Sequence, residues 1–424
     1  MKHVLHITGM TIFPGRLGML TTRAAGFVWR QTCRFMKLSG REAGPLRRPA
    51  SHGSTDAETV VRPNTIPIAD TVKSRKIVTP NITGTVVLIA AAGVFTFAGN
   101  PCAATSVPRV VFGQTSPLSY ELTPPVRKAV RKGLLWLARR QATDGSYGRG
   151  NQVAITALAG IAFMAGGNLP GQGPYGANEA RALHYVLSQC RQSGLIAAAD
   201  DGEPMYGQGF ATLFLAEIYG ESHAPELRQK LQRAVRLIVQ TQNNQGGWRY
   251  QPMPMDGDIS VTICQVMALR AARQAGIAVP RRTIQKAIGF VRRLQNPDGG
   301  FSYMLNMRGS DFPRTAAGVA LLFYAGVYRG RVIDSAMAYM LNCLPGNPQN
   351  NQGNFFYGNY YGVQAMFLAG GRWWAKWWPA IRTVLLARQS ADGNWIGGAG
   401  ASYATAMALI ILQVPDRLLP ILQK

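Results

Sequence analysis

Two kinds of apolar pattern alternate along most of this chain. The stretch that begins at Lys132 places apolar residues at helical spacing between Arg and Lys, whereas the stretch around Thr156 is apolar on nearly every side. The first pattern predicts a helix with one face in water, and the second predicts a buried helix. A glycine-rich turn separates them. The unit is therefore expected to be a pair of helices, one exposed and one buried.

This unit recurs six times. Its best copies are KGLLWLARRQATDGSY from Lys132, RAVRLIVQTQNNQGGW from Arg233 and KAIGFVRRLQNPDGGF from Lys286. One position of the frame, usually glutamine, recurs every 45 to 53 residues, at Gln141, Cys190, Gln242, Gln295, Leu344 and Gln389. Such repeats bury their apolar faces only against their neighbours. The sequence predicts an all-α fold, a single α6/α6 toroid in which six helix pairs form two concentric rings.

The turn of each repeat has its own chemistry. An Asp-Gly pair, as at Asp144-Gly145, supplies the left-handed residue that ends the exposed helix. The glutamine amide is expected to bond free N–H groups at the start of a neighbouring helix. Thr123 followed by two prolines predicts the start of the first outer helix. The buried helices are expected to open near a threonine, at Thr156, Thr212, Thr262, Thr315 and Thr405.

Ahead of the repeats lies a leader with a different composition. Residues 1–76 are basic and are expected to be largely disordered, and residues 105–123 form a linker to the toroid at 124–420. Between them, residues 77–104 lack charge, and the apolar run 82–99 follows Lys73, Arg75 and Lys76. This order is typical of a signal peptide with a start codon near residue 70, or of a retained membrane anchor with one hydrophobic helix. Both readings predict an extracytoplasmic toroid.

Charge and cysteine content indicate which classes of partner and metal site to expect. The net charge of +25 favours anionic surfaces, and its clustering on the exposed helices suits either a solvated face or contact with an anionic membrane; nucleic acid is not expected. The five cysteines lack CxxC spacing, so packed thiols are expected rather than disulfides or a zinc site. No cofactor and no metal are predicted.

The repeat frame resembles the QW motif of squalene-hopene and oxidosqualene cyclases, (K/R)(G/A)x2-3(F/Y/W)(L/I/V)x3Qx2-5GxW. The resemblance covers about residues 124–415 and implies the α/α toroid that terpene cyclases share with prenyltransferase β subunits. Squalene cyclases carry two toroids with the reaction cavity between them, whereas this chain has length for one. The prenyltransferase zinc pattern, Asp-x-Cys with a distant His, does not occur around Cys190, Cys264 or Cys343.

The acids Asp256 and Asp258 are the candidate catalytic residues. The run Asp256-Gly-Asp258-Ile259 is similar to the DxDD motif of class II terpene cyclases, whose middle Asp protonates an alkene, but Ile259 stands at the third acid. The structural interpretation is that Asp258 or Ser260 caps the helix that follows.

Aromatic residues gather in the turns that open onto one mouth of the predicted ring. The candidate ligand-binding residues are Tyr147, Tyr206, Trp248, Tyr250, Tyr303, Asp311, Tyr357, Tyr360 and Tyr361. Three functions remain open: binding of a hydrophobic, isoprenoid-like molecule or lipid, proton-initiated cyclisation or isomerisation by Asp258, and a polysaccharide-binding or lyase-type toroid. The oligomeric state is not predicted.

Overall fold

The computed structural model of the protein describes residues 121–222, 224–347 and 354–423. Within these ranges the chain is all-helical, with twelve α-helices and two short 3-10 helices. Paired strands are limited there to isolated bridges in the turns, such as that between Trp248 and Asp258. The predicted leader and its apolar segment 82–99 lie outside the described residues.

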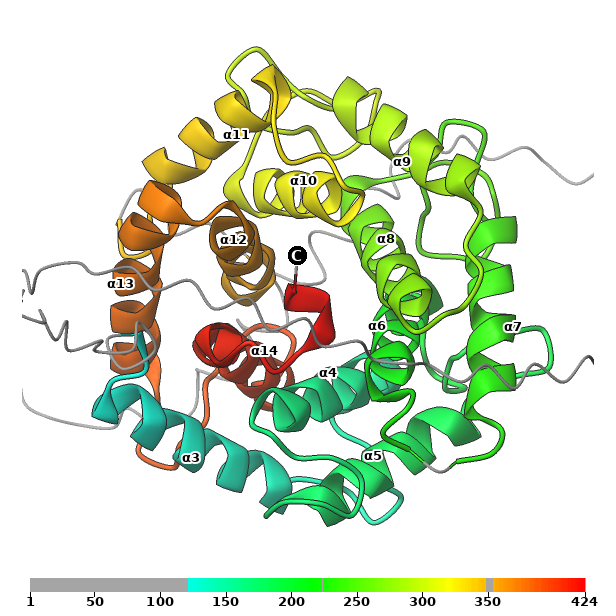
Figure 1. Ribbon diagram of the computed structural model, residues 1–424, viewed down its shortest axis with the longest axis vertical. Helices are drawn as coiled ribbons and strands as arrows, with labels where there is room; N and C mark the ends of the chain where they lie inside the picture. Colours follow the sequence, from blue (N-terminus) through cyan, green and yellow to red (C-terminus); the bar gives the residue numbers. More distant parts are fainter. Residues whose placement is uncertain (1–120, 223, 348–353, 424) are drawn as a thin grey trace, which may run out of the picture. The chain divides into compact units, whose positions relative to one another are not determined.

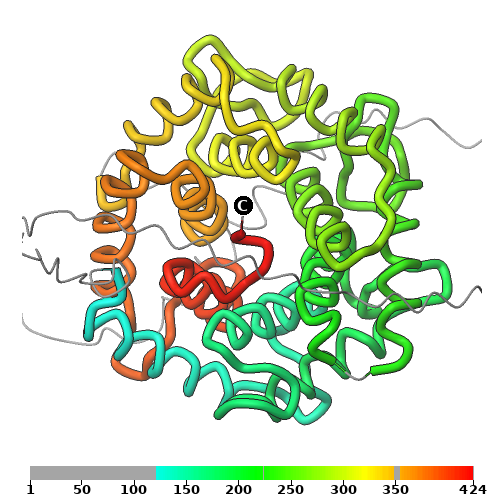
Figure 2. The backbone as a smooth tube through the Cα atoms, in the orientation of Figure 1, coloured from blue at the N-terminus to red at the C-terminus, as the bar shows by residue number. Residues whose placement is uncertain are grey.

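The helices form two concentric rings, and the chain passes from the outer ring to the inner ring and back in each repeat (Figures 1 and 2). The outer ring consists of α3 (Pro124–Arg139), α5 (Gly176–Ser188), α7 (Leu227–Gln240), α9 (Arg281–Arg293), α11 (Arg331–Asn342) and α13 (Gly371–Arg388). The inner ring consists of α4 (Gln152–Ala165), α6 (Pro204–Ile218), α8 (Ile259–Gln274), α10 (Phe312–Tyr324), α12 (Phe355–Ala369) and α14 (Ala401–Gln413). The predicted toroid of six helix pairs is confirmed.

The two ends of the repeat array meet and close both rings. In Figure 1 the red α14 lies beside α4, and the orange α13 lies beside the cyan α3, and these helices are in contact. A side-chain hydrogen bond joins the last repeat to the first: Gln389 Nε2 donates to Ala129 O in α3 at 2.9 Å. No repeat of the array is therefore left with an uncovered apolar end.

In five of the six repeats, the turn after the outer helix packs against the backbone of the next outer helix. Gly246 has φ +97°, and a Cβ there would lie 2.2 Å from Lys286 O. Corresponding contacts join Gly145 to Arg181 O, Gly194 to Arg233 O, Gly299 to Ser335 O and Gly393 to Lys132 O. Glycine is required at these positions both by the left-handed backbone and by the lack of space.

The motif glutamine reinforces the same junction. Gln242 Nε2 donates to Gly246 O at 3.0 Å in its own turn and to Thr283 O at 2.9 Å in the next outer helix. The prediction that the amide bonds free N–H groups of a helix start was wrong. The amide NH₂ instead satisfies carbonyl oxygens, because the turn presents its own carbonyl and that of the neighbouring helix to the same side chain.

The threonines that recur at the start of the inner helices accept hydrogen bonds from the preceding turns. Thr262 Oγ1 accepts from Trp248 N at 3.1 Å, and Thr156, Thr315 and Thr405 do the same in their repeats. In the second repeat this role falls to Gln208, whose Oε1 accepts from Ile196 N at 2.8 Å. Thr212 was therefore assigned wrongly: α6 begins at Pro204, and Thr212 lies too far along it to reach the turn.

Side chains fill the centre of the inner ring. Tyr360 on α12 contacts Phe210 on α6 with ring centroids 6.1 Å apart, and Tyr361 places its hydroxyl 3.2 Å from Cys264 Sγ on α8. Beyond α14, the segment with η2 (Val414–Asp416) and η3 (Pro420–Leu422) reaches the C-terminal ends of α6 and α8. There Ile421 N donates to Glu217 Oε2 at 3.0 Å. This end of the ring is covered by the chain itself.

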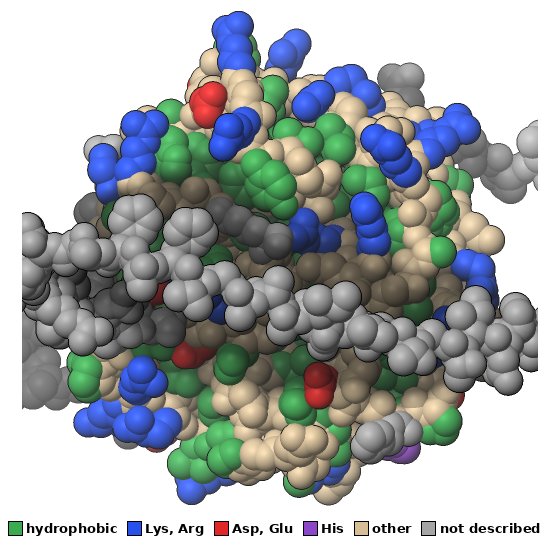
Figure 3. Space-filling view, in the orientation of Figure 1, with side chains coloured by type: hydrophobic (Ala, Val, Ile, Leu, Met, Phe, Trp, Pro, Cys, Tyr) green, Lys and Arg blue, Asp and Glu red, His purple; other side chains and the backbone are tan. Residues whose placement is uncertain are grey.

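The surface of the toroid is strongly cationic around its periphery. Figure 3 shows Lys and Arg side chains spread around one face. Outer helices carry exposed basic residues such as Lys128, Arg131 and Arg282. Within the described ranges no helix combines the length and the apolar character that crossing a bilayer requires.

Replacement of Gly246 by alanine tests the junction. We expect Gly220→Ala, at φ +98° with nothing within 4 Å, to cost about 1–2 kcal/mol from backbone strain alone. Gly246→Ala at nearly the same φ should cost about 1–3 kcal/mol more, because its Cβ meets Lys286 O. Urea unfolding of both variants measures the difference. Equal losses of unfolding free energy would show that the seating of the turn contributes nothing.

Candidate functional site

The candidate site lies at the mouth formed by the N-terminal ends of the inner helices. Five partly exposed tyrosines from several repeats belong to it: Tyr206 at the start of α6, Tyr250 and Tyr303 in two turns, Tyr357 on α12 and Tyr403 on α14. We call this set the tyrosine mouth. The repeats bring these residues together because each turn ends at the same end of the ring.

Asp258 lies fully buried at the centre of this region. It is the N-cap of α8, and its Oδ1 accepts from Ser260 N at 2.8 Å and from Val261 N at 2.9 Å. The capping interpretation is therefore confirmed. The second oxygen, Oδ2, is buried and lies 3.9 Å from Arg249 Nε. Burial raises the pKa of Asp258 to about 7, although the two N–H donors, Arg249 and Tyr303 oppose that shift.

Arg249 links the two candidate acids. Its NH1 group forms an ion pair of 2.6 Å with Asp256 Oδ2, which is largely exposed, and its Nε faces Asp258. The guanidinium also lies over the rings of Tyr250 and Tyr303, at 5.1 and 5.9 Å from their centroids. Asp256, Arg249 and Asp258 thus form one charge chain that runs from solvent to the buried cap.

The tyrosine hydroxyls are joined to one another and to the backbone. Tyr250 and Tyr303 share a hydrogen bond, and the Tyr206 and Tyr250 rings are 5.9 Å apart. Tyr357 donates to Ser260 O at 3.2 Å. Burial is the main cause that raises the pKa of Tyr250 to about 12 and raises the pKa values of Tyr206, Tyr303 and Tyr357 well above the usual tyrosine value, so these hydroxyls stay protonated at neutral pH.

The remaining predicted ligand-binding residues occupy other places. Tyr360 and Tyr361 are fully buried and form the floor beneath the mouth, where burial raises the pKa of the Cys264 thiol to about 12. Trp248 is buried with its Nε1 donating to Ile238 O at 2.7 Å, and Tyr147 is buried in the first turn. Asp311 is the N-cap of α10 and pairs with Arg314 Nε at 2.8 Å.

Sequence reasoning did not identify Arg249 or Cys264 as members of this site. Arg249 directly follows the motif tryptophan Trp248, and its two acidic partners were already candidates. The presence of this arginine in the same turn as the two acids was the sequence signal that could have identified it. Cys264 had no signal, because its proximity to Tyr361 depends on the approach of α8 and α12 across the ring.

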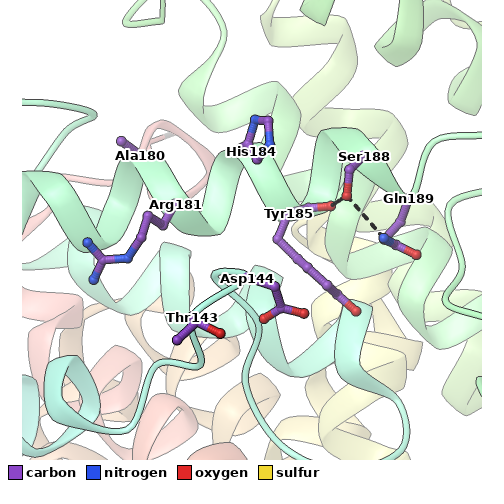
Figure 4. Close-up of a pocket in the computed structure, with 8 residues that line it drawn as sticks. All are labelled: Thr143, Asp144, Ala180, Arg181, His184, Tyr185, Ser188 and Gln189. Atoms are coloured by element: carbon purple, nitrogen blue, oxygen red, sulfur yellow. Dashed lines mark hydrogen bonds between the residues drawn. The ribbon is translucent and has the colours of Figure 1, made fainter.

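A separate pocket of about 520 Å³ lies on the outside of the ring, between the first turn and α5. It is lined by Thr143, Asp144, Ala180, Arg181, His184, Tyr185, Ser188 and Gln189. Figure 4 shows Ser188 and Gln189 joined by a hydrogen bond at one end and Arg181 at the other. None of the predicted site residues lines it. Among the described residues no group of three His, Cys, Asp or Glu side chains is placed to hold a metal ion.

The comparisons with known proteins agree with this architecture. The sequence model of the prenyltransferase alpha-alpha toroid domain matches residues 212–347. No curated protein matches the chain in sequence.

Solved structures with unrelated chemistry share the fold. The type II terpene cyclase MstE from Scytonema matches with TM-score 0.51 and 15% identity, over 70% of this chain and 99% of that one. Cellobiose 2-epimerase from Spirochaeta thermophila matches with TM-score 0.53 and 13% identity, over 70% and 98%. A protein from Actinoplanes matches with TM-score 0.51 and 16% identity, over 69% and 99%. At these identities the likeness shows the fold alone.

The repeat frame, the closed double ring, the family match and these solved structures lead to one assignment. The described part of this chain is an α/α toroid that is similar in fold to type II terpene cyclases, and its residues 212–347 match the prenyltransferase alpha-alpha toroid domain.

Proposed function

We propose that this protein binds a hydrophobic, isoprenoid-like small molecule at the tyrosine mouth. The observation that carries the proposal is the convergence of five partly exposed tyrosines from several repeats above a floor of buried aromatic side chains. The opposite end of the ring is covered by the C-terminal segment, so we expect a ligand to approach from the mouth. Aromatic walls with few polar groups are the usual lining of small-molecule sites.

The rim of the mouth supports an apolar ligand. Four large apolar side chains are exposed in the turns that surround it: Met253, Met255, Met307 and Ile396. They lie in three different repeats, and Met255 and Ile396 are 74% and 78% exposed. Exposed apolar side chains are typical of surfaces that bind apolar ligands. The MstE cyclase, whose fold this toroid shares, has been solved with geranylgeranyl dihydroxybenzoate as its substrate.

Binding of geranylgeraniol, a twenty-carbon isoprenoid alcohol, to the full-length protein in mild detergent tests the proposal. Removal of the aromatic surface by Tyr206→Leu with Tyr303→Leu should weaken binding about tenfold or more, because each ring contact contributes about 0.5–1.5 kcal/mol. The matched control is Tyr328→Leu, at a partly exposed tyrosine after α10 that packs on Phe323. Calorimetric titration gives the dissociation constants. An equal effect of the control would place the ligand elsewhere.

A second candidate function is proton-initiated isomerisation by Asp258. Two observations favour it: the pKa of about 7, which keeps a large share of the carboxyl protonated at neutral pH, and the fact that both capping N–H groups donate to Oδ1 and leave Oδ2 outside the cap. Asp258 has no exposed surface, so proton transfer to a ligand requires Arg249 or Tyr303 to move aside. Capping and acid chemistry use different oxygens of the same side chain and do not exclude each other.

Asp258→Asn separates these two roles. Asparagine still caps α8 through its Oδ1, so the variant should fold and bind ligand. Conversion of an isoprenoid polyene, followed by mass spectrometry, should be lost, and conversion by the wild type should fall as pH rises through about 7, because only the protonated acid donates. Unchanged conversion by the variant would remove Asp258 as the acid.

The same raised pKa has a consequence for folding. The native state holds a proton that the unfolded chain releases near pH 4, so the free energy of unfolding should fall between about pH 4 and pH 7 and level off above. Asp258→Asn should flatten the part of this dependence that Asp258 causes. Denaturant titrations across that pH range measure it, and an identical slope in both proteins would contradict the assignment.

The carbohydrate alternative and the extracytoplasmic location stay predictions. Sugar-processing structures share the fold, but the acids at the mouth are occupied by caps and ion pairs. The segment on which the location depends lies outside the described residues.

A further inference from the structure

The mouth differs in charge from the rest of the toroid. Three carboxyl groups, those of Glu203, Asp256 and Asp258, lie close enough to act on Arg249 or Tyr250 there, although the chain as a whole has a net charge of +25. In the described toroid, most Lys and Arg side chains lie on the outer helices, one helix diameter of about 10 Å away from the inner ring. At physiological salt that distance is about one screening length, so the local charges dominate at the mouth.

Two arginines at this end of the ring are already engaged in ion pairs. Arg249 pairs with Asp256 at 2.6 Å and faces Asp258, and Arg314 pairs with Asp311 at 2.8 Å. An anionic ligand group would have to displace these carboxylates and leave them beside its own charge. Glu203, at the start of α6, adds a further carboxyl, and burial raises its pKa while Arg249 lowers it.

The tyrosine hydroxyls offer the opposite kind of contact. Their raised pKa values keep them neutral, and each hydroxyl both donates and accepts. Tyr250 and Tyr303 form a hydroxyl pair, and the centroids of both rings lie within 6 Å of the Arg249 guanidinium. A hydroxyl on the ligand can join this pair without introducing charge.

We propose, on the basis of the function proposed above, that the mouth selects isoprenoids with an uncharged hydroxyl end and excludes the corresponding diphosphates. The carboxylates repel the diphosphate, and the two arginines that would neutralise it are held in ion pairs. The tyrosine hydroxyls bind the alcohol.

The test compares geranylgeraniol with geranylgeranyl diphosphate on the full-length protein, in the same detergent and with EDTA to keep divalent cations from masking the diphosphate. We expect the alcohol to bind at least tenfold more tightly, and the ratio to shrink as salt screens the repulsion. Equal or tighter binding of the diphosphate overturns the selection while leaving the proposed binding function intact. Binding of neither molecule overturns both.

A charge variant tests the cause of the selection. Asp256→Asn removes one exposed carboxylate and breaks its ion pair with Arg249. This change should tighten diphosphate binding severalfold and leave alcohol binding nearly unchanged. Asp392→Asn is the matched control, because it removes the same charge from an exposed turn position in the sixth repeat, which lies across the ring from the third. A gain in the control equal to that of Asp256→Asn, or no gain in either variant, contradicts the role of the Asp256–Arg249 pair.

Discussion

The contact between a glycine turn and the backbone of the next outer helix is the constraint on which the structure depends. At Gly246 the turn lies so close to Lys286 O that no side chain fits, and the motif glutamine bonds carbonyls on both sides of the contact. The angle between successive repeats is thereby fixed by backbone atoms, which vary little between copies. Five such contacts are built alike, and the one made by Gly393 closes the ring on the first outer helix.

The same constraint builds the candidate site. Because these glycine turns contact the next outer helix in the same way, the residues that follow them lie at the same end of the ring, however far apart they are in sequence. Tyr250 and Tyr303 follow equivalent anchors in successive repeats, and their hydroxyls meet. The inner helices then contribute the floor, where Tyr361 reaches Cys264. The cluster of tyrosines at the mouth follows from a repeat that places an aromatic residue beyond its turn.

The repeat pattern predicted the fold because the spacing of apolar residues and glycines is periodic and local. The direction of the glutamine bonds was predicted wrongly, since the amide's partners belong to another repeat. The substitute role of Gln208 was also not predictable, because it depends on where α6 begins. At the site, the acids and most tyrosines of the mouth were identified from their motif positions. Arg249 was not, and Tyr360 and Tyr361 proved to be buried floor, because contacts across the ring leave no periodic signal.

The central claim is that a hydrophobic ligand occupies the tyrosine mouth, and photolabelling tests it most directly. A diazirine-bearing isoprenoid alcohol, activated by light on the full-length protein, can be located by mass spectrometry of the labelled peptides. The account predicts labels at the rim and wall of the mouth, around Tyr206, Met255, Tyr303 and Tyr357, that excess geranylgeraniol suppresses. Labels confined to the outer pocket at Arg181 and His184, or spread over the outer helices without competition, would contradict it.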